Sequence, residues 1–190
     1  MKTERIKASF QESAQVKLRF VEQHETMIAD VAKRWTAALK KEHKLLFFGN
    51  GGSACDATHL AAEFVNRFHR ERPALAALSL ATDTAALTSI SNDYDYDQIF
   101  ARQLQALGQK GDVAVAISTS GNSPNVLKAV EVAKARGLVT VAFTGKDGGK
   151  LAPLVDYAFI VPSESTPRIQ ETHITLGHLL CELVEEELYG

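Results

Sequence analysis

The 190-residue chain contains little cysteine and no long apolar run, and each absence narrows what the protein can be. Its two cysteines, Cys55 and Cys181, are too few for a disulfide framework, which favours a reducing compartment. No apolar run approaches the roughly 18 residues that are needed to span a bilayer. The first residues, MKTERIKASFQES, are charged and lack the apolar core of a secretory signal. These absences predict a cytoplasmic protein.

An excess of charge of one sign is also missing. The formal net charge is -2, so no broad basic surface is expected to recruit nucleic acid or anionic lipid. Any anionic ligand must therefore be held by local geometry. The length suits one domain with a continuous core, and no repeat, low-complexity tract or linker divides it. We expect a single domain over 1–190, with a helical segment over 1–42 and a sheet core with a closing helix over 43–190.

Short apolar segments rich in β-formers alternate with helical patterns. Strands are predicted over 44–49, 76–80, 112–117, 138–143 and 157–161, and helices over 54–68, 84–91, 97–107, 124–136 and 168–188. This alternation is typical of an α/β fold with a five-stranded parallel sheet flanked by helices, as in flavodoxin-like proteins. Ligands of such sheets bind at the carboxyl ends of the strands, near a switch in strand order.

A long helix is predicted before the first strand, over residues 4–42, because apolar residues recur there mostly at three- and four-residue steps. Its apolar face must be buried somewhere. Packing on the sheet domain and packing on another subunit are equally compatible with the pattern, so N-terminal helices that mediate oligomerisation are one of two expectations.

The loop Gly49–Ser53 follows a predicted strand and opens a helix. Unpaired backbone N–H groups and the helix dipole favour an anion there, and the glycines let the backbone approach it. With Ala54 the loop also matches G-x-G-x-x-A, the dinucleotide fingerprint, but Ser79 and Thr82 lie where its acidic residue is expected. A phosphate loop is favoured, and a simple tight turn is the alternative.

A second loop, Ser118–Ser123, reads STSGNS and follows the third predicted strand. Ser123 is predicted to be the N-cap of a helix that begins at Pro124. The three other hydroxyl groups, on Ser118, Thr119 and Ser120, exceed what a turn requires. Hydroxyls and backbone amides at a helix start suit a phosphate monoester that must bind and then leave; the alternative is a polar loop with a good cap.

Four polar residues line one stripe of the helix after the first loop: Asp56, His59, Glu63 and Arg67. A solvated, salt-bridged face is the ordinary explanation of such a stripe. However, Glu63 lies only about 15 Å along the helix from the first loop, a distance much of which a phosphosugar could bridge. His59 and Glu63, at i and i+4, could also chelate a divalent metal.

The closing helix carries two histidines. His178 shares a face with Ile174 and Cys181, so a core histidine is as good an explanation as a functional one. His173 lies about 140° around the helix from His178, so the two are not expected to act together.

The ordered set of motifs is highly specific. GNGGS, H-x-x-x-E, STSGNS, TGKDGG at 144–149 and RIQE-x-H, with a further histidine five residues on, together resemble the phosphoheptose isomerase family of sugar isomerase (SIS) domains. The similarity covers nearly the whole chain. It implies conversion of sedoheptulose 7-phosphate to D-glycero-D-manno-heptose 7-phosphate, towards the ADP-heptose of lipopolysaccharide core. It also implies a homotetramer with active sites at subunit interfaces.

The resemblance also implies roles for particular residues. The acid–base pair would be Glu63 and His178, and one Zn²⁺ per subunit would be bound by His59, Glu63, Gln170 and His178. Substrate contacts would come from Asn50, Gly51, Gly52, Ser53, Glu63, Arg67, Asn92, Asp93, Ser118, Thr119, Ser120, Ser123 and Gln170. Pro167 departs from the family, because some members have an acidic residue there that serves one sugar-hydroxyl contact.

Aldose–ketose isomerisation moves a proton between C1 and C2 through an enediol, which requires a base and a polarised carbonyl oxygen. We expect Glu63 to carry the carbon-bound proton and His178 to assist ring opening or the oxygen-bound proton. A carboxylate on zinc is a weaker base, so the metal would hold one oxygen only or be absent from some steps.

Gln170 and His178 are about 12 Å apart along a helix. Sharing one ion therefore needs Gln170 in the preceding loop, long side-chain reach, or ligands from different subunits.

Two other function classes stay open. Some SIS-domain proteins associate with the bacterial replication initiator and have lost the acid–base pair, whereas Glu63 and His178 are both present here. A phosphosugar-sensing regulator would keep the serine loop without a base, but no DNA-binding pattern accompanies the domain in these residues. Cys55 is disfavoured as a nucleophile, because isomerisation forms no acyl intermediate. Turnover of sedoheptulose 7-phosphate would separate the three classes.

Overall fold

Five parallel strands form one sheet in the order β2-β1-β3-β4-β5. The computed structural model describes residues 2–190, and Met1, the first residue of the expected domain, lies outside them. The strands are β1 (Leu45–Gly49), β2 (Ala77–Ser79), β3 (Val113–Ile117), β4 (Val139–Gly145) and β5 (Tyr157–Val161). All five predicted strands are confirmed, with ends that differ by at most two residues.

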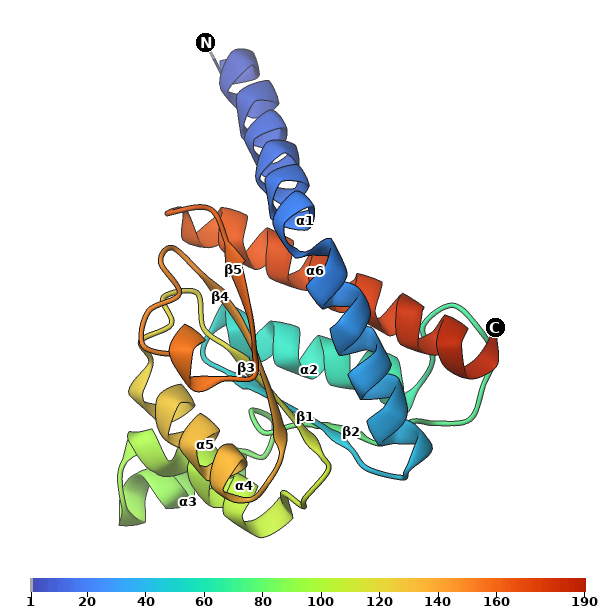
Figure 1. Ribbon diagram of the computed structural model, residues 1–190. Helices are drawn as coiled ribbons and strands as arrows, with labels where there is room; N and C mark the ends of the chain where they lie inside the picture. The colour runs from blue at the N-terminus through green and yellow to red at the C-terminus, as the bar shows by residue number, and fades with distance from the viewer. Residues whose placement is uncertain (1) are drawn as a thin grey trace.

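Helices cover both faces of this sheet. They are α1 (Lys2–Lys40), α2 (Gly52–Val65), α3 (Thr84–Asp93), α4 (Ile99–Leu107), α5 (Pro124–Ala135) and α6 (Thr166–Tyr189), with short 3₁₀ helices η1 (Tyr96–Gln98) and η2 (Ala152–Leu154). Helices α1, α2 and α6 lie on one face, and α3, α4 and α5 lie on the other (Figure 1). The expected α/β architecture with a parallel sheet is therefore confirmed.

The strands read as continuous apolar runs because both of their faces are covered. Every residue of β1 and β3 is buried. Leu45 and Phe47 join the core beneath α1, α2 and α6, while Leu46 and Phe48 join the core beneath α4 and α5. Successive side chains of a strand point to opposite faces, so one short strand contributes to two hydrophobic cores.

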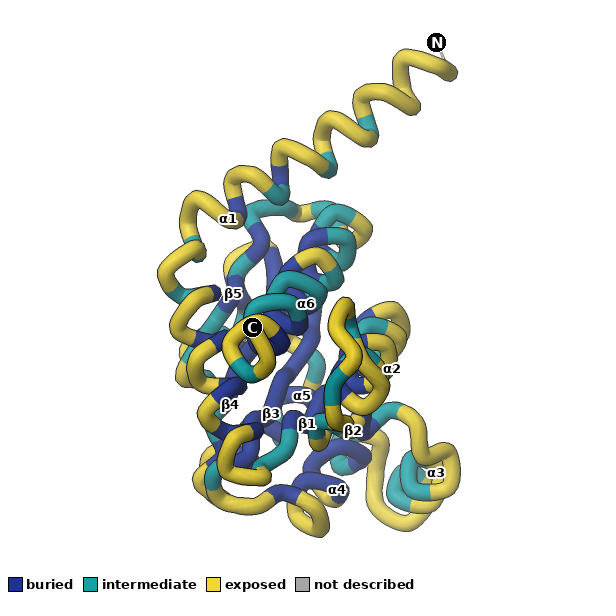
Figure 2. Tube along the Cα trace, turned by 90° about the vertical axis from the view of Figure 1, so that its right-hand side faces the viewer, coloured by how far each residue is buried: buried dark blue, intermediate teal, exposed yellow. Residues whose placement is uncertain are grey.

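The N-terminal segment is one continuous helix of 39 residues rather than several helices. Its second half packs on α6 and the sheet, where Val31 and Trp35 are fully buried. The start of the helix projects away from the body and is mostly exposed (Figures 1 and 2), although Val16 and Phe20 further along are buried. Ile6 is 59% and Phe10 is 77% exposed there. Across residues 2–190, no helix is both long and apolar enough to cross a membrane.

The strand order shows where along the sheet a ligand is expected to bind. From β1 the chain turns to β2 on one side, and β3 lies on the other side, so strand order switches between β1 and β3. Gly49 and Ile117, the last residues of these two strands, are paired in the sheet. The two predicted phosphate loops therefore emerge side by side at the switch point, where α/β sheets bind ligands.

Candidate active site

Two asparagines join the loops at the carboxyl edge of β1 and β3. Asn50 Nδ2 donates to Asn125 Oδ1 at 2.9 Å, and Asn125 Nδ2 donates back to Asn50 Oδ1 at 2.9 Å. The Tyr96 hydroxyl donates to the same Asn50 oxygen at 3.0 Å. Asn125 is 1% exposed, so its amide is a buried polar group with its partner in place. The reciprocal pair, which we call the amide clamp, fixes the spacing of the two loops.

The serine turn is compact and internally bonded. The hydroxyl groups of Ser118 and Ser123 lie 3.1 Å apart, and Ser120 Oγ accepts from the backbone of Asn122 at 3.2 Å. Ser123 occupies the N-cap position of α5 as predicted, but its side chain makes no capping hydrogen bond. The predicted N-cap residue is therefore confirmed, and its hydroxyl faces Ser118 instead of the first turn of the helix. Thr119 and Ser120 are half-buried at the same turn.

The TGKDGG motif, residues 144–149, packs its backbone against the serine turn. Gly121 has a φ of 63°, and a Cβ there would collide with the Gly148 backbone. The Leu151 N–H donates to Gly121 O at 2.9 Å, and the Lys150 N–H donates to Asn122 Oδ1 at 3.2 Å. Only glycine fits where the two segments touch at positive φ. The motif is thus a backbone support for the serine turn.

Two further predicted contacts lie close to the first loop. Gln170 packs against the start of α2, because a Cβ added to Gly52 would meet its Nε2 atom. Ser53 is 3% exposed beneath the same turn. Asn92 and Asp93 end α3, are exposed, and share a hydrogen bond of 2.9 Å from Asn92 Nδ2 to Asp93 Oδ1.

A second group of predicted residues meets where α2 and α6 run side by side. His59 Nε2 and His178 Nε2 lie 2.7 Å apart, and Glu63 Oε1 is 3.4 Å from His59 Nε2. Partial burial lowers the pKa of His178 from its ordinary value, His59 lowers it further, and Glu63 opposes the shift. His178 is therefore not the satisfied core histidine of the alternative explanation. The histidine in the core is His173, which is fully buried, with its Nε2 atom hydrogen-bonded to Thr144 O.

The rest of the polar stripe on α2 divides in two. Asp56 lies beside His59, and its Oδ2 atom is buried without a hydrogen-bond partner in residues 2–190. Burial raises the pKa of Asp56 to about 6, although His59 acts in the opposite direction. Arg67 instead forms an exposed ion pair with Glu71 at 3.5 Å. One end of the stripe, at Arg67, is therefore a solvated ion pair, and the other end, at Asp56, is a partly buried polar group.

The two groups of residues lie at different heights along the same two helices, one near their starts and the other about two turns further on. Both α2 and α6 begin at the carboxyl edge of the sheet and run in the same direction (Figure 1). Gln170 therefore lies beside Gly52, and His178 lies beside His59. Gln170 is inside α6, not in the preceding loop, so it is separated from His178 by about 12 Å of helix. Within one chain, Gln170 cannot share an ion with His59 and His178.

The donor set suits zinc by residue type but not by its present spacing. In the part of the chain that the structure describes, no group of three or more His, Cys, Asp or Glu side chains is placed so that it could hold a metal ion. Two nitrogen ligands of a tetrahedral zinc lie about 3.3 Å apart, and the nitrogens of His59 and His178 lie 2.7 Å apart. Two imidazoles and a carboxylate suit zinc by type. Binding of zinc would require the two rings to separate and a further ligand to be supplied.

One feature beside this site was missed from the sequence: a buried ion pair between Arg72 and Glu185, 2.9 Å apart. Glu185 also accepts hydrogen bonds from the backbone of Phe68, His69 and Arg70. Phe68, held in this way, stacks near His178 with ring centroids 5.6 Å apart. Neither charge stands out in the sequence, since Arg72 lies in RERP and Glu185 lies in an acidic run.

Comparisons with known proteins identify the family and the fold. The SIS domain family matches residues 9–145. A phosphoheptose isomerase of Thermodesulfovibrio yellowstonii is 59% identical over 98% of this chain and 92% of that protein, and one of Aquifex aeolicus is 56% identical over 96% of each. The solved phosphoheptose isomerase of Neisseria gonorrhoeae is 43% identical, with a TM-score of 0.92 over 98% of this chain and 100% of that one. That of Francisella tularensis is 36% identical, with a TM-score of 0.94 over 98% and 99%.

The chain therefore belongs to the SIS domain family of sugar isomerases. Within that family it falls among the phosphoheptose isomerases, as both the curated relatives and the solved structures indicate. The family and the fold expected from the motifs are confirmed. The replication-initiator and sensor classes are not favoured.

Proposed function

We propose that the protein is an aldose–ketose isomerase that converts sedoheptulose 7-phosphate to D-glycero-D-manno-heptose 7-phosphate, which supplies ADP-heptose for lipopolysaccharide core. The observation that carries the proposal is the meeting of a carboxylate and two imidazoles from α2 and α6: His59 Nε2 lies 2.7 Å from His178 Nε2 and 3.4 Å from Glu63 Oε1. The names of relatives at 56% and 59% identity support the same activity.

The phosphate would bind at the switch point between the two loops. Backbone amides at the starts of α2 and α5 favour an anion, and the hydroxyls of the serine turn offer neutral donors that release it again. Asn50, Gly51, Gly52 and Ser53 would contribute from the first loop, and Ser118, Thr119, Ser120 and Ser123 from the second. Asn92, Asp93, Arg67 and Gln170 would contact the remainder of the sugar phosphate.

Proton transfer would then use Glu63, near the C-terminal end of α2, and His178 of α6. Glu63 would take the proton from one of the two carbons and return it to the other, passing through an enediol. His178, whose lowered pKa favours the neutral ring near pH 7, would exchange the oxygen-bound proton. The enediol needs both roles, because the carbonyl oxygen must gain a proton as the carbon loses one.

Zinc would be held by His59, Glu63 and His178, with Gln170 of a second copy as a further ligand, because the Gln170 of the same chain is too distant. The metal would supply polarisation of the carbonyl oxygen. Binding by one carboxylate oxygen would leave the other oxygen of Glu63 to act as the base.

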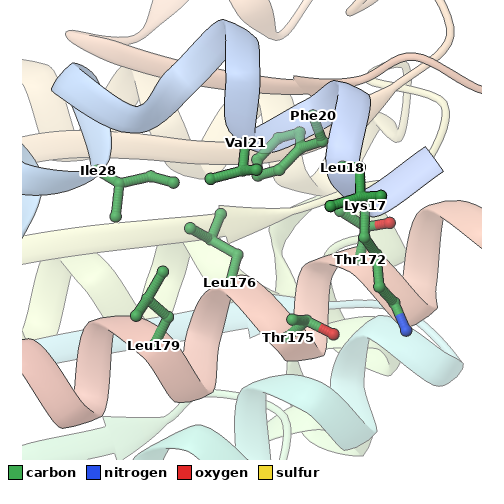
Figure 3. A pocket seen from close by; sticks show the side chains of 9 residues that line it. All are labelled: Lys17, Leu18, Phe20, Val21, Ile28, Thr172, Thr175, Leu176 and Leu179. Carbon is green, nitrogen blue, oxygen red and sulfur yellow. The ribbon is translucent and has the colours of Figure 1, made fainter. Parts of the chain in front are cut away.

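A homotetramer in the cytoplasm completes the proposal. The exposed start of α1 (Figure 2) and an apolar hollow between α1 and α6 (Figure 3) offer a surface for a second copy. The hollow has a volume of about 200 Å³ and is lined largely by aliphatic side chains, among them Leu18, Val21, Ile28, Leu176 and Leu179. Apolar surface of this kind is expected at an interface between subunits. The two cysteines, one exposed and one buried and both free, suit a reducing compartment.

The test is turnover of sedoheptulose 7-phosphate in a coupled assay. We expect Glu63→Gln and His178→Gln each to lower kcat at least about a hundredfold, since general acid–base groups contribute about 10²–10⁴. Glu131→Gln, which alters an exposed carboxylate on α5, is the matched control and should behave as the wild type. Circular dichroism should show an unchanged fold. Substantial activity in either site variant would remove that residue from its proposed role.

A further inference from the structure

The side chain of Asn50 has almost no hydrogen-bonding capacity left within the chain. A carboxamide offers two N–H donors and two acceptor lone pairs on its oxygen. Asn125 Nδ2 and the Tyr96 hydroxyl both donate to Asn50 Oδ1, at 2.9 and 3.0 Å. One Asn50 N–H donates to Asn125 Oδ1 at 2.9 Å. A single N–H group therefore remains to meet a ligand.

This remaining group is a donor and cannot accept a hydrogen bond. A phosphate oxygen is an acceptor and pairs with this N–H group directly. A sugar hydroxyl can accept from the same N–H group only when its own O–H bond points elsewhere. The Tyr96 hydroxyl is the group that occupies the last lone pair. Without it, the oxygen of Asn50 would be open to a hydroxyl group or to water, and the carboxamide would lose one of its three restraints.

Tyr96 is well placed for this role and has little other packing. It begins η1 and is 58% exposed, so its ring adds little to the core. Its neighbours Asp95 and Asp97 both approach Lys128 on α5, at 3.9 and 3.7 Å. These ion pairs hold η1 against α5, and the hydroxyl group of Tyr96 then reaches back to the first loop.

We propose that Tyr96 is a specificity-determining positioning residue: its hydroxyl makes Asn50 a donor-only group and so selects a phosphate oxygen at the first loop. The inference deepens the proposed function and rests on it to the extent that Asn50 contacts the substrate phosphate. It concerns the binding of the phosphate and leaves proton transfer to Glu63 and His178.

The experiment compares Tyr96→Phe with Tyr94→Phe. Tyr94 is also 58% exposed and lies on the same connection, but its ring stacks over Arg102 at 4.4 Å. We expect Tyr96→Phe to raise the KM for sedoheptulose 7-phosphate and the Ki of inorganic phosphate by the same factor, about two- to tenfold, which is the range of one net hydrogen bond. Its kcat and melting temperature should stay those of the wild type. Tyr94→Phe should change none of these quantities.

Two results would overturn the inference. One is a Tyr96→Phe variant with the same KM and Ki as Tyr94→Phe. The other is a fall in kcat with KM and Ki unchanged, since that would place the hydroxyl in the chemical step. If the wild type does not turn over sedoheptulose 7-phosphate, the proposed function fails by itself. Calorimetric titration of the three proteins with inorganic phosphate then decides the inference, which requires weaker binding in Tyr96→Phe alone.

Discussion

At the scale of single residues, the most unusual titratable group is His173, because it is buried in the core without a charged partner. Its Nε2 atom donates to Thr144 O at 3.0 Å, and its Nδ1 atom has no partner in the described part of the chain, residues 2–190. Burial lowers the pKa of His173 to about 4, although the bond to Thr144 acts the other way. The folded protein therefore excludes a proton that the unfolded chain binds.

This difference predicts how stability depends on pH. The pKa is about 6.5 in the unfolded chain and about 4 in the folded one, so the contribution is intact above pH 6.5 and is lost as the pH falls towards 4. The loss amounts to about 3 kcal/mol. We expect His173→Gln to be less stable than the wild type at pH 7.5 but to lose less on acidification. Urea unfolding of both proteins at pH 7.5, 6 and 5 measures this, and parallel curves would contradict it.

Residue types with a strong local signal were predictable, and those defined only by distant contacts were not. The serine turn and the stripe containing His59 and Glu63 follow from spacing within a few residues. The amide clamp joins Asn50 to Asn125, which is 75 residues away, and Tyr96 joins it across 46 residues. No periodicity encodes such a contact. The N-cap position of Ser123 was predicted correctly, but the direction of its hydroxyl, which faces Ser118 and does not cap α5, depends on tertiary structure.

At the scale of elements, the segment between α2 and β2 depends on one buried ion pair. The Arg72 and Glu185 side chains are 2% and 3% exposed. Arg72 Nη1 and Nη2 donate to Phe64 O and Glu63 O, among the last carbonyls of α2, at 2.9 and 2.8 Å. Burial by itself raises the pKa of Glu185, but three backbone N–H donors and Arg72 outweigh it and lower the pKa. The pair thus ends α2 just beyond Glu63.

We therefore expect Glu185→Gln to destabilise the protein strongly. The change leaves the Arg72 charge buried without its counter-ion, and breaking such a pair costs about 3–5 kcal/mol. Because Phe68 loses an anchor next to His178, kcat should fall more than KM rises. Denaturant unfolding and steady-state kinetics measure the two effects.

Glu186→Gln is the matched control for this variant, since Glu186 is the exposed neighbour on the same helix. It should leave both stability and kcat close to those of the wild type. Equal behaviour of the two variants would show that the buried pair does not support the site.

The elements themselves were predicted well because each carries its own pattern. The strands are apolar runs of a few residues between glycine- and serine-rich loops, and their predicted ends were at most two residues from those observed. The largest strand error is at β4, which continues to Gly145 because Gly145 pairs with Val161 of β5. Strand pairing, and not local sequence, sets that end. Helix α2 begins at Gly52, two residues earlier than predicted, because the first loop is tighter than assumed.

At the scale of the whole molecule, the sequence predicted the parallel sheet but did not specify the strand order or the direction of α1. The long first helix follows the first of the two expectations over much of its length, because Val31 and Trp35 are buried against this chain, whereas packing on another subunit stays a prediction. The order β2-β1-β3-β4-β5 then decides which residues can meet. It brings Gln170 to Gly52, at the start of α2, and His178 to His59, about two turns further along that helix.

This separation leads to a prediction about mixed assemblies. If a complete site takes His59, Glu63 and His178 from one copy and Gln170 from another, Gln170→Ala and His178→Gln should complement each other. Each variant alone should be nearly inactive. In a symmetric assembly refolded from equal amounts of both, about one quarter of the sites would combine an intact His178 with an intact Gln170. Turnover should therefore recover to about one quarter of the wild-type value.

The control mixes His178→Gln with Glu63→Gln. These two residues come from the same copy in every site, because Glu63 and His178 both contact or adjoin His59 within one chain. Every site in that mixture lacks one of them, and no activity should return. Recovery in the control, or none in the first mixture, would mean that the sites are not divided between copies in this way. The zinc content of the first mixture should rise in step with its turnover, since the complete sites are also the ones that carry Gln170 beside the imidazoles.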